Sequence, residues 1–491
     1  MKLFSLIKNI NCRTFGTTNL SITGIYHHDT EVKENGLFFC LRGTRVDGNN
    51  YIFSAIKNGA VAIVTEQEIP NLKNITQVVV KNARESMSLI ACQFFGNPAN
   101  KLKIVGVTGT NGKTSISTML FSVLSNMNKK VALIGTNGII IDKQKYESKL
   151  TTPDPIDLQR FFSIMVKKHI EYVFMEVSAH AIDLFKIEGF RFEQIIWTNL
   201  TEDHLDYFKT MDNYFKTKLK IFNAKYTKNA IINIDDPYGK EIIKSIKIPF
   251  ITYSINEDNN KSITNSIQNI IAKNITQKNY KYSYQLENDV LINLQLSGKF
   301  NISNSLATIA SLKLFGFSDL IISNQIEKIQ PIEGRFNIYN IDGVIVVIDF
   351  AHTPDGLYNA LETCKEIALN NKIICVFGCG GNRDKEKRKI MGKIASNSAN
   401  FSIITSDNPR FESEEDIAKD IESGFEKNNY KIVLDRTTAI KNAISISKCG
   451  DLVLIAGKGA EKYIDKRGEQ IPYSDYDVIK NISKTLKWKL W

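Results

Sequence analysis

Short apolar runs recur along the chain, separated by segments in which apolar residues return every three or four positions. Runs of roughly four to eight residues bounded by Gly, Asn or Asp are typical of buried strands, whereas the longer period predicts helices. Strand and helix therefore alternate, which predicts an α/β fold with mostly parallel sheets. The expected strands are 37–43, 60–66, 77–80, 102–109, 130–136, 172–178, 194–200, 230–236, 344–350, 373–379, 401–407, 431–435 and 451–457.

Two breaks divide this pattern into three blocks. Gly96-Asn97-Pro98 interrupts it once, and a second interruption precedes Pro331. We expect a mixed α/β domain at 1–98, a central domain at 99–330 with a mostly parallel sheet around a phosphate-binding loop, and a doubly wound, Rossmann-like domain at 331–491. The polar, Asn- and Tyr-rich segment 254–296 predicts an antiparallel excursion from the central sheet.

Composition narrows the class of protein only slightly. The 491 residues carry a net charge of +11, but the lysines are scattered, which favours a solvated surface over a nucleic-acid-binding stripe. The seven cysteines lack zinc-like spacing, so free thiols in a reducing compartment are expected. The chain lacks a run of roughly 20 apolar residues, and its first residues do not resemble a secretion signal. We expect a monomeric cytoplasmic protein without membrane insertion.

The first chemical signal is a Gly-rich loop that lies between a predicted strand and a predicted helix. Glycines at such a turn let backbone N–H groups approach phosphate oxygens, a lysine neutralises the phosphates and a hydroxyl ligates Mg²⁺. Lys113 and Thr114 suit these two roles. Val107 stands where the strict P-loop pattern has its first glycine, so the loop is a shorter variant. Its residues are Gly109, Thr110, Asn111, Gly112, Lys113, Thr114 and Ser115.

Two further polar residues follow predicted strands in the same block. Glu176 ends the run 172–178, and His204 comes shortly after the run 194–200. A carboxylate and a neutral imidazole at strand ends are able to ligate a metal ion. A capping carboxylate and an ordinary loop histidine explain the same residues equally well when each is taken alone.

The order of motifs resembles the Mur ligase family over essentially the whole chain. The resemblance is closest to those members that add the third amino acid of the peptide, because the chain has a 98-residue N-terminal block and a DNPR motif. The motifs are GTNGKTS (109–115), TTPDP (151–155), MEVSAHA (175–181), TNLTEDHLDYF (198–208), GRF (334–336), DFAHTPDGL (349–357), GCGGNRDKEKR (378–388), DNPR (407–410) and GKGAE (457–461).

The resemblance implies an ATP-dependent ligase that adds meso-diaminopimelate to UDP-N-acetylmuramoyl-L-alanyl-D-glutamate through an acyl phosphate, with ATP and Mg²⁺ required. It assigns catalysis to Lys113, Glu176, His204 and Lys218, and metal binding to Thr114, Glu176, His204 and Lys218. In this family a lysine is carbamylated, which requires a depressed amine pKa. We expect that modification, N6-carboxylysine, at Lys218, four residues after Tyr214; a solvated lysine is the alternative.

The resemblance also distributes the substrates over the remaining motifs. Beyond the loop 109–115, it assigns ATP to Asn301, Asn304, Arg335, Asp349 and His352. It assigns the UDP-linked dipeptide to Asp29, Thr151, Thr152, Ser178 and Lys186. It assigns meso-diaminopimelate to Arg383, Asp407, Asn408, Pro409, Arg410, Gly457 and Glu461. Arg410 would pair with the far carboxylate of this acceptor, which lysine lacks.

The chain departs from the family pattern at several positions. His28-Asp29-Thr30 stands for Asp-Ser-Arg, which puts a carboxylate where a uridine contact is expected, and Lys186 stands for Arg. Asn337 replaces an acidic residue, Phe350 a Tyr and Ala460 a His. Because the phosphate loop and the metal ligands are intact, we expect activity to be retained.

Other functions remain open at this point. A ligase that adds L-lysine, or another Mur ligase, would share most of these motifs. A folylpolyglutamate synthetase-like ligase would share the central fold, but it lacks the N-terminal block and the DNPR motif. An inactive nucleotide-binding protein is the alternative from a different class, which loss of Lys113, Glu176 or Lys218 would favour.

Overall fold

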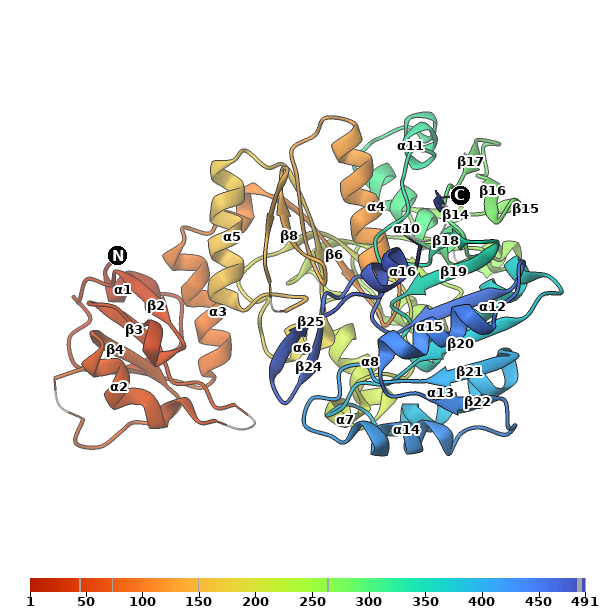
Figure 1. Cartoon of the computed structure of the whole chain (residues 1–491). Coiled ribbons are helices and arrows are strands. Elements are labelled where there is room, and N and C mark those ends of the chain that lie inside the picture. Colours follow the sequence, from red (N-terminus) through yellow and green to blue (C-terminus); the bar gives the residue numbers. More distant parts are fainter. Residues whose placement is uncertain (44–45, 73, 149, 263–264, 484–487, 491) are drawn as a thin grey trace. The chain divides into compact units, whose positions relative to one another are not determined.

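The computed structural model describes residues 1–43, 46–72, 74–148, 150–262, 265–483 and 488–490 (Figure 1). The chain divides into two compact units. Unit 1 comprises 1–108, 128–195 and 220–230, and unit 2 comprises 109–127, 196–219 and 231–491. The division passes through strands β11 (Phe192–Trp197) and β12 (Thr227–Asn233), so the two units do not coincide with the three predicted domains. The three-domain partition stays a prediction.

The N-terminal block of unit 1 is a five-stranded mixed sheet with helices. The strand order is β1-β5-β4-β3-β2; β1 pairs antiparallel with β5, and the other pairs are parallel. Leu37, Val64, Val78 and Ile90 are fully buried in one core, which explains the apolar runs. The elements are α1 Leu3–Ile7, β1 Cys12–Phe15, β2 Gly24–Tyr26, β3 Gly36–Phe39, α2 Ile52–Lys57, β4 Ala60–Thr65, β5 Thr76–Val80 and α3 Ala83–Phe94.

A nine-stranded sheet follows, in the order β14-β13-β12-β11-β6-β10-β7-β8-β9. Strand β10 pairs in parallel with β6 and with β7, as the alternation of strands and helices predicts. The hairpin β7–β8–β9 is antiparallel. The strands are β6 Lys103–Thr108, β7 Val131–Gly135, β8 Gly138–Ile141, β9 Gln144–Tyr146, β10 Tyr172–Glu176, β11, β12, β13 Phe250–Ser254 and β14 Gln268–Ile271. The helices are α4 Lys113–Asn126, α5 Pro155–Lys167, α6 Ala179–Asp183, α7 Leu205–Phe208, α8 Met211–Leu219 and α9 Pro237–Ser245.

The predicted antiparallel excursion is present but begins later than expected. Strands β15 (Lys273–Lys278), β16 (Lys281–Gln285) and β17 (Leu291–Asn293) form an antiparallel sheet. Within the predicted segment, however, β14 pairs in parallel with β13 and extends the nine-stranded sheet. The apolar pair Ile270 and Ile271 explains this difference, because both side chains are buried at the end of β14.

The C-terminal part of unit 2 is a seven-stranded sheet in the order β22-β21-β20-β23-β19-β18-β26. The strands from β22 to β19 run parallel, and β18 is antiparallel to β19. The strands are β18 Asn337–Ile341, β19 Val344–Asp349, β20 Ile373–Phe377, β21 Phe401–Ile404, β22 Tyr430–Ile432, β23 Leu452–Ala456 and β26 Trp488–Leu490. The helices of this part and of the segment before it are α10 Phe300–Leu314, α11 Asp319–Ile326, α12 Pro354–Ala368, α13 Glu386–Ser398, α14 Glu414–Glu422, α15 Arg436–Ile446 and α16 Asp475–Ser483.

Alternate residues of β23 belong to two different cores. Leu452 and Leu454 pack in a core that includes residues of α12, α13 and α14, whereas Val453 and Ile455 pack in one that includes residues of α15 and α16. Successive strand residues point to opposite faces, so helices cover both faces of the sheet. This confirms the doubly wound prediction. A separate hairpin, β24 (Tyr463–Lys466) and β25 (Glu469–Pro472), follows β23.

Candidate active site

The phosphate loop lies between the end of β6 and the first residue of α4, where the sequence predicts it. Gly109 has a φ of +147°, and a Cβ there would lie 1.8 Å from Thr198 Oγ1, so only glycine fits. Lys113 Nζ donates to the carbonyls of Gly109 (2.9 Å) and Thr110 (2.7 Å). The lysine is thus folded back over its own loop, at a helix N-terminus that suits an anion.

A second segment braces the loop, and sequence reasoning did not assign it a role. Asn199 accepts from the backbone N–H of Thr110 through its carbonyl and from that of Asn111 through Oδ1, both at 2.9 Å. Thr198 Oγ1 donates to the carbonyl of Asn111 at 2.6 Å, and the backbone N–H of Thr201 donates to Thr110 Oγ1 at 3.0 Å. These residues belong to the motif 198–208, so their position in that motif was the available signal.

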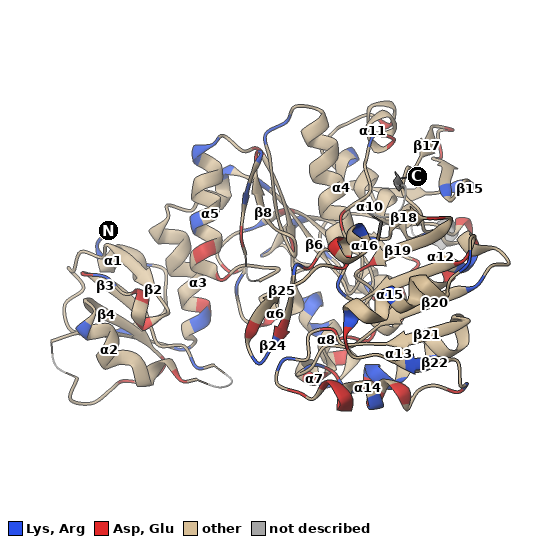
Figure 2. Cartoon of the chain, viewed as in Figure 1, with Lys and Arg blue, Asp and Glu red and all other residues tan. Residues whose placement is uncertain are grey.

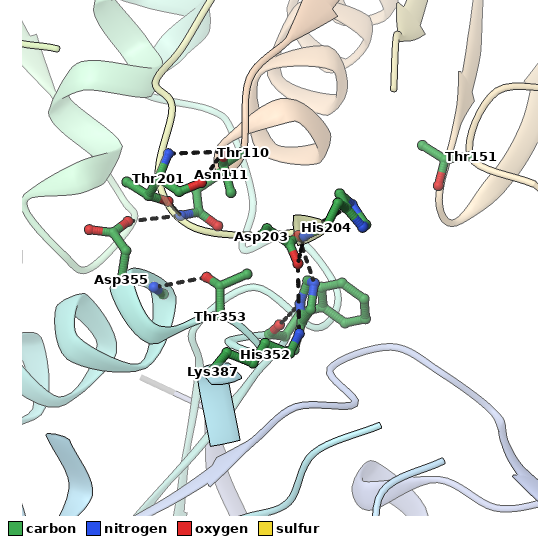
Figure 3. Close-up of polar contacts among 12 residues, drawn as sticks. Thr110, Asn111, Thr151, Thr201, Asp203, His204, His352, Thr353, Asp355 and Lys387 are labelled. Atoms are coloured by element: carbon green, nitrogen blue, oxygen red, sulfur yellow. Dashed lines mark hydrogen bonds and ion pairs between the residues drawn. The ribbon is translucent and has the colours of Figure 1, made fainter. Parts of the chain in front are cut away.

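The side chain of Asn111 has a partner in the C-terminal part of the chain. Its Nδ2 donates to Asp355 Oδ2 at 2.8 Å (Figure 3). Asp355 lies in the first turn of α12, whose N-cap Thr353 accepts from the N–H of Gly356. Since 244 residues separate Asn111 from Asp355, this contact fixes the tip of the phosphate loop against a helix that the sequence alone does not place there.

Asp203 is a meeting point for residues of three motifs (Figure 3). Its Oδ2 lies 3.3 Å from His204 Nε2 and 3.9 Å from His352 Nε2, and its Oδ1 lies 3.7 Å from Lys387 Nζ. Burial alone would raise the pKa of Asp203, but His204, Lys387, His352 and Lys113 together hold it well below its usual range. The sequence predicted roles for both histidines but missed the carboxylate between them.

Lys218 is buried beside the phosphate loop. Its side chain is 1% exposed, and Nζ donates to the carbonyl of Gly109 at 3.0 Å. Burial and the neighbouring Lys113 ammonium lower the pKa of Lys218 far below its ordinary value, although Asp203 opposes this shift. The solvated lysine that the sequence left open as an alternative is therefore excluded.

The residues predicted to bind the nucleotide lie at different points of unit 2. Asn304 Nδ2 donates to Asn301 Oδ1 at 3.0 Å in the first turns of α10. Arg335 Nη2 donates to Thr114 Oγ1 at 2.8 Å, and its guanidinium lies 4.5 Å from the centroid of the Phe350 ring. Arg335 is thus held between the phosphate loop and an aromatic face.

Asp349 and His352 have backbone partners of their own. Asp349 accepts from the N–H of Phe336 at 2.8 Å and from that of Ala351 at 2.9 Å, so both of its oxygens are engaged. Burial raises the pKa of Asp349, against the effect of the neighbouring Arg335 guanidinium. His352 Nδ1 lies 2.9 Å from the carbonyl of Phe350, and this carbonyl requires the proton on Nδ1. Asp349 therefore also organises its own turn.

In unit 1, Glu176 lies close to Thr151, Thr152 and Ser178, three of the residues predicted for the sugar nucleotide. Glu176 is buried at the end of β10 and accepts from Thr136 through both oxygens, at 2.9 and 3.0 Å. Thr136 Oγ1 is 3.3 Å from Thr151 Oγ1. Thr152 Oγ1 donates to the carbonyl of Glu176 at 2.9 Å. The capping and the metal-binding interpretations of Glu176 both remain compatible with these contacts.

Lys186 and Asp29 have different surroundings within the same unit. Lys186 Nζ pairs with Asp154 Oδ1 at 2.8 Å, a partner that the sequence did not suggest, and Ser178 caps α6. Asp29 Oδ2 accepts from Ser54 Oγ at 2.6 Å. The carboxylate of Asp29 therefore ties helix α2 to the short 3-10 helix Asp29–Glu31, which explains how a carboxylate is tolerated at this position.

The residues predicted for the acceptor amino acid surround the carboxyl ends of β21 and β23. Gly457 has a φ of +114°, and a Cβ there would lie 2.6 Å from Asp407 Oδ2. Asn408 Nδ2 donates to Glu461 Oε2 at 2.9 Å. Pro409 precedes Arg410, whose backbone is left-handed with a φ of 51°. Four of the predicted residues are thus brought to one edge of the sheet, as expected for a doubly wound fold.

Two arginines flank this edge. Arg410 Nη1 donates to the carbonyl of Gly381 at 2.8 Å, in the loop that also carries Arg383. Arg388 is fully buried and binds both oxygens of Glu412, at 3.0 and 3.1 Å. Arg388 therefore fastens the segment after the DNPR motif to the start of α13, a structural role that its motif does not reveal.

Charged residues are scattered over the described part of the chain, as the sequence predicts. Acidic and basic residues share single helices, as in α5 with Asp157 and Arg160 and in α14 with Glu415 and Lys419 (Figure 2). Among the described residues, no helix is long and apolar enough to cross a bilayer. The same residues contain no group of three or more His, Cys, Asp or Glu side chains placed to hold a metal ion by themselves.

Comparison with known proteins gives the family directly. A relative from Clostridium tetani, named UDP-N-acetylmuramoyl-L-alanyl-D-glutamate--2,6-diaminopimelate ligase, is 38% identical over 99% of this chain and 100% of its own length. The chain belongs to the Mur ligase family. Three family profiles match it in turn: "Mur ligase family, catalytic domain" at residues 21–95, "Mur ligase middle domain" at 107–312 and "Mur ligase, glutamate ligase domain" at 334–459.

Other Mur ligases extend this result. The similarly named proteins of Clostridioides difficile and Bacteroides thetaiotaomicron are 40% and 38% identical over 94% and 98% of this chain, and over 95% and 100% of their own lengths. A solved structure titled as the same ligase is 26% identical, has a TM-score of 0.68 and is covered to 99% in both chains. The MurF ligase of Thermotoga maritima, solved with ADP, shares the fold at 20% identity and a TM-score of 0.60, over 90% of this chain and 96% of that one.

Three departures from the Mur ligase pattern are neighbours in space. Asn337 accepts from the N–H of Gly334 at 2.6 Å and donates to the carbonyl of Ile332 at 3.0 Å. A Cβ on Gly334 would lie 2.1 Å from the backbone nitrogen of Ala460. Phe350 lies beneath the guanidinium of Arg335. The three changes therefore surround one turn, which carries Arg335, and are expected to depend on one another.

Proposed function

We propose that this Mur ligase joins 2,6-diaminopimelate to UDP-N-acetylmuramoyl-L-alanyl-D-glutamate at the expense of ATP, in peptidoglycan synthesis in the cytoplasm. The observation that carries the proposal is its similarity, over nearly its whole length, to relatives that bear this name, at 38% identity in Clostridium tetani and 40% in Clostridioides difficile. The phosphate loop, braced by Asn199 and Thr198, supports the use of ATP.

We infer that the acceptor is the meso isomer, with its far carboxylate on Arg410. Diaminopimelate differs from lysine by that carboxylate, and a guanidinium binds a carboxylate through two parallel N–H donors. Arg410 is positioned by its own side-chain bond to Gly381 and by a contact of 3.6 Å between its Nε and Asp465 Oδ2. Asp407, Asn408 and Glu461 would face the amino group at the same end of the sheet.

The reaction begins when the terminal carboxylate of the UDP-linked dipeptide attacks the γ-phosphate of ATP, which yields an acyl phosphate and ADP. The acceptor amine then attacks the acyl carbon, and phosphate leaves as the amide forms. Lys113 and Arg335 would stabilise negative charge on the phosphates during the first step. In this proposal, Lys113 releases the loop carbonyls that it now binds and turns toward the substrate.

The residues predicted to hold Mg²⁺ suit an ion that is shared with phosphates. Mg²⁺ prefers oxygen ligands and is usually bound by one or two carboxylates together with substrate phosphates. The Thr114 hydroxyl and the Glu176 carboxylate are such ligands, and His204 and Lys218, as a carbamate, complete the predicted set. When bound, Mg²⁺ would neutralise charge on the phosphates. The deep burial and low pKa of Lys218 support its carbamylation at neutral pH.

The decisive experiment measures phosphate release from ATP with UDP-N-acetylmuramoyl-L-alanyl-D-glutamate, and compares meso-diaminopimelate, its LL isomer and L-lysine as acceptors. We expect turnover that depends on meso-diaminopimelate. An Arg410→Lys variant keeps the positive charge but loses the two parallel N–H donors of the guanidinium. Its KM for meso-diaminopimelate should therefore rise roughly tenfold to a hundredfold. Turnover with L-lysine alone would support the ligase reaction but refute meso-diaminopimelate as the acceptor. An absence of turnover with every acceptor would refute the proposed reaction.

A further inference from the structure

Lys458 is the most deeply buried cation at the carboxyl end of β23. Its side chain is 0% exposed, although it lies in the short segment between β23 and β24. Nζ donates to Asn408 Oδ1 at 3.0 Å and to Glu461 Oε2 at 2.9 Å, and it lies 4.0 Å from Asp407 Oδ1. An ammonium carries three donors, and here it makes two hydrogen bonds and one longer ion pair.

These bonds determine how Asn408 and Glu461 are oriented. Asn408 Oδ1 accepts from Lys458 and from the backbone N–H of Asp465, at 3.0 and 2.9 Å, so the oxygen of the amide must point to that side. The Nδ2 group then points to Glu461 Oε2, at 2.9 Å. Glu461 Oε2 therefore receives two donors, from Asn408 and from Lys458. A lysine buried among these oxygens sets both side chains at once.

A purely structural ion pair would join elements of the fold, and the chain offers such a case. Lys313 pairs with both oxygens of Asp319 at 2.7 Å, between α10 and α11, with side chains 19% and 12% exposed. That pair contacts none of the residues that the sequence assigned to a substrate. Every described hydrogen bond of Lys458 Nζ, in contrast, ends on a residue that was assigned to the acceptor.

We infer that Lys458 is a positioning residue that orients Asn408 and Glu461 for the amino group of the acceptor. This inference rests on the proposed function. Lys458 also balances the negative charge of Glu461, whose side chain is partly exposed, and of the buried Asp407. A carboxylate and an amide that are already fixed lose less conformational freedom when the acceptor binds than two mobile side chains would, so the acceptor binds more tightly.

The test compares three KM values in Lys458→Met, Lys313→Met and the unchanged protein. Lys313→Met removes a partly buried lysine–carboxylate pair of the ordinary structural kind and serves as the matched control. Lys458→Met should raise the KM for meso-diaminopimelate roughly tenfold to a hundredfold, the effect of losing hydrogen bonds to charged groups. The KM values for ATP and for the UDP-linked dipeptide should change by less than about threefold. Equal increases in all three would overturn the inference, because they would indicate a general structural role.

A double-mutant cycle with Glu461→Gln tests the proposed route of action. If Lys458 acts through Glu461, the double variant should have an acceptor KM close to that of Glu461→Gln alone; fully additive effects would contradict this. Lys458→Gln, which retains a donor, replaces Lys458→Met if the latter does not fold. Turnover of the unchanged protein is measured first. If it does not use meso-diaminopimelate, the proposed function fails; if it does and the acceptor KM of the variants is unchanged, only the role of Lys458 fails.

Discussion

Two lysines of unit 2 are buried to the same extent but have opposite surroundings. Lys218, 1% exposed, donates to a backbone carbonyl of the phosphate loop and has the Lys113 ammonium as an electrostatic neighbour. Lys458, 0% exposed, bonds to Asn408 and Glu461 and lies near Asp407. Burial alone therefore does not decide what a lysine does. A cationic neighbour favours a neutral, reactive amine, whereas neighbouring carboxylates hold a fixed cation.

The largest effect should come from replacing Lys218. Lys218→Met is expected to lower kcat by roughly a thousandfold, as loss of a group that stabilises transition-state charge does. In buffer free of carbon dioxide, where Lys218 is a free amine, the free energy of unfolding at pH 7 should stay equal or rise, because an apolar side chain does not have to lose a proton to be buried beside Lys113. Turnover assays and urea unfolding of Lys218→Met and of Lys216→Met, an exposed neighbour, would check this. Strong destabilisation of Lys218→Met alone would break the comparison.

The sign of the Lys218 effect also depends on pH. The pKa of Lys218 in the folded protein lies far below its unfolded value, so protonation opposes folding at any pH below the unfolded value of about 10.4. The stability gained by Lys218→Met should therefore be largest at neutral pH and shrink as the pH approaches about 10.4. If the stability gained by Lys218→Met is constant between about pH 7 and about pH 10, titration of the Lys218 amine is not its cause.

Replacing Lys458 should act in the opposite direction on stability. Lys458→Met leaves Glu461 and Asp407 without their buried cation, so the free energy of unfolding should fall by about 2–3 kcal/mol, somewhat less than for a pair buried on both sides. Turnover at saturating acceptor should persist. Urea unfolding of Lys458→Met and Lys218→Met would compare the two changes in stability. Lys462→Met, which replaces an exposed lysine nearby, is the control. Unchanged stability would show that Lys458 is not held as a cation.

A smaller effect is expected where the phosphate loop meets α12. Asp355→Ala removes the acceptor of the Asn111 side chain and should raise the KM for ATP by a factor equivalent to about 1–2 kcal/mol. Asp355→Asn keeps an oxygen at the same place and is the matched control. ATP titrations at saturating acceptor would measure both. Equal KM values for the two variants would show that the hydrogen bond itself is not important.

The smallest effect concerns stability in acid. The pKa of Asp203 in the folded protein lies below its ordinary value, so its ionised form stabilises the fold above about pH 4, and this contribution is lost as the pH falls further. Asp203→Asn keeps the bond to the N–H of His204 but cannot carry the charge. Between about pH 5 and about pH 3, the free energy of unfolding of the variant should therefore fall by about 1 kcal/mol less than that of the unchanged protein. An equal loss of stability in both proteins over this pH range would contradict this.

The sequence predicted local features of the site well. The phosphate loop, its strand and its helix lie within one short stretch, and the glycine at 109 is required by local backbone geometry. The parallel strands of the C-terminal sheet, from β22 to β19, were equally visible, because their apolar runs are continuous. Strand β18 was missed, although its buried and half-buried residues alternate from Asn337 to Ile341. Its two asparagines concealed the apolar face.

Contacts between distant segments were not predictable. Asp203 meets His352 and Lys387, and nothing in the spacing of these residues indicates that the three converge. The same holds for Asp355 and for Lys458, each of which lies inside a quoted motif without a role assigned to it. A motif identifies which residues belong to a site, whereas the division between binding and positioning residues follows from packing. Asp29 shows the reverse case, since its carboxylate has a local partner in Ser54.

The backbone of Arg410 has a consequence for the redesign of acceptor choice. Its N–H donates to the carbonyl of Asp465 at 2.9 Å, and its own carbonyl accepts from the N–H of Arg467 at 2.7 Å, so the hairpin β24–β25 holds it in a left-handed conformation. Asp465 also donates to Asn408. In the proposed function, the conformation of the acceptor-binding segment 407–410 therefore depends on a second stretch of sequence, the hairpin 463–472. A chimera that transplants 407–410 into a lysine-adding ligase should stay unselective until residues 463–472 accompany it.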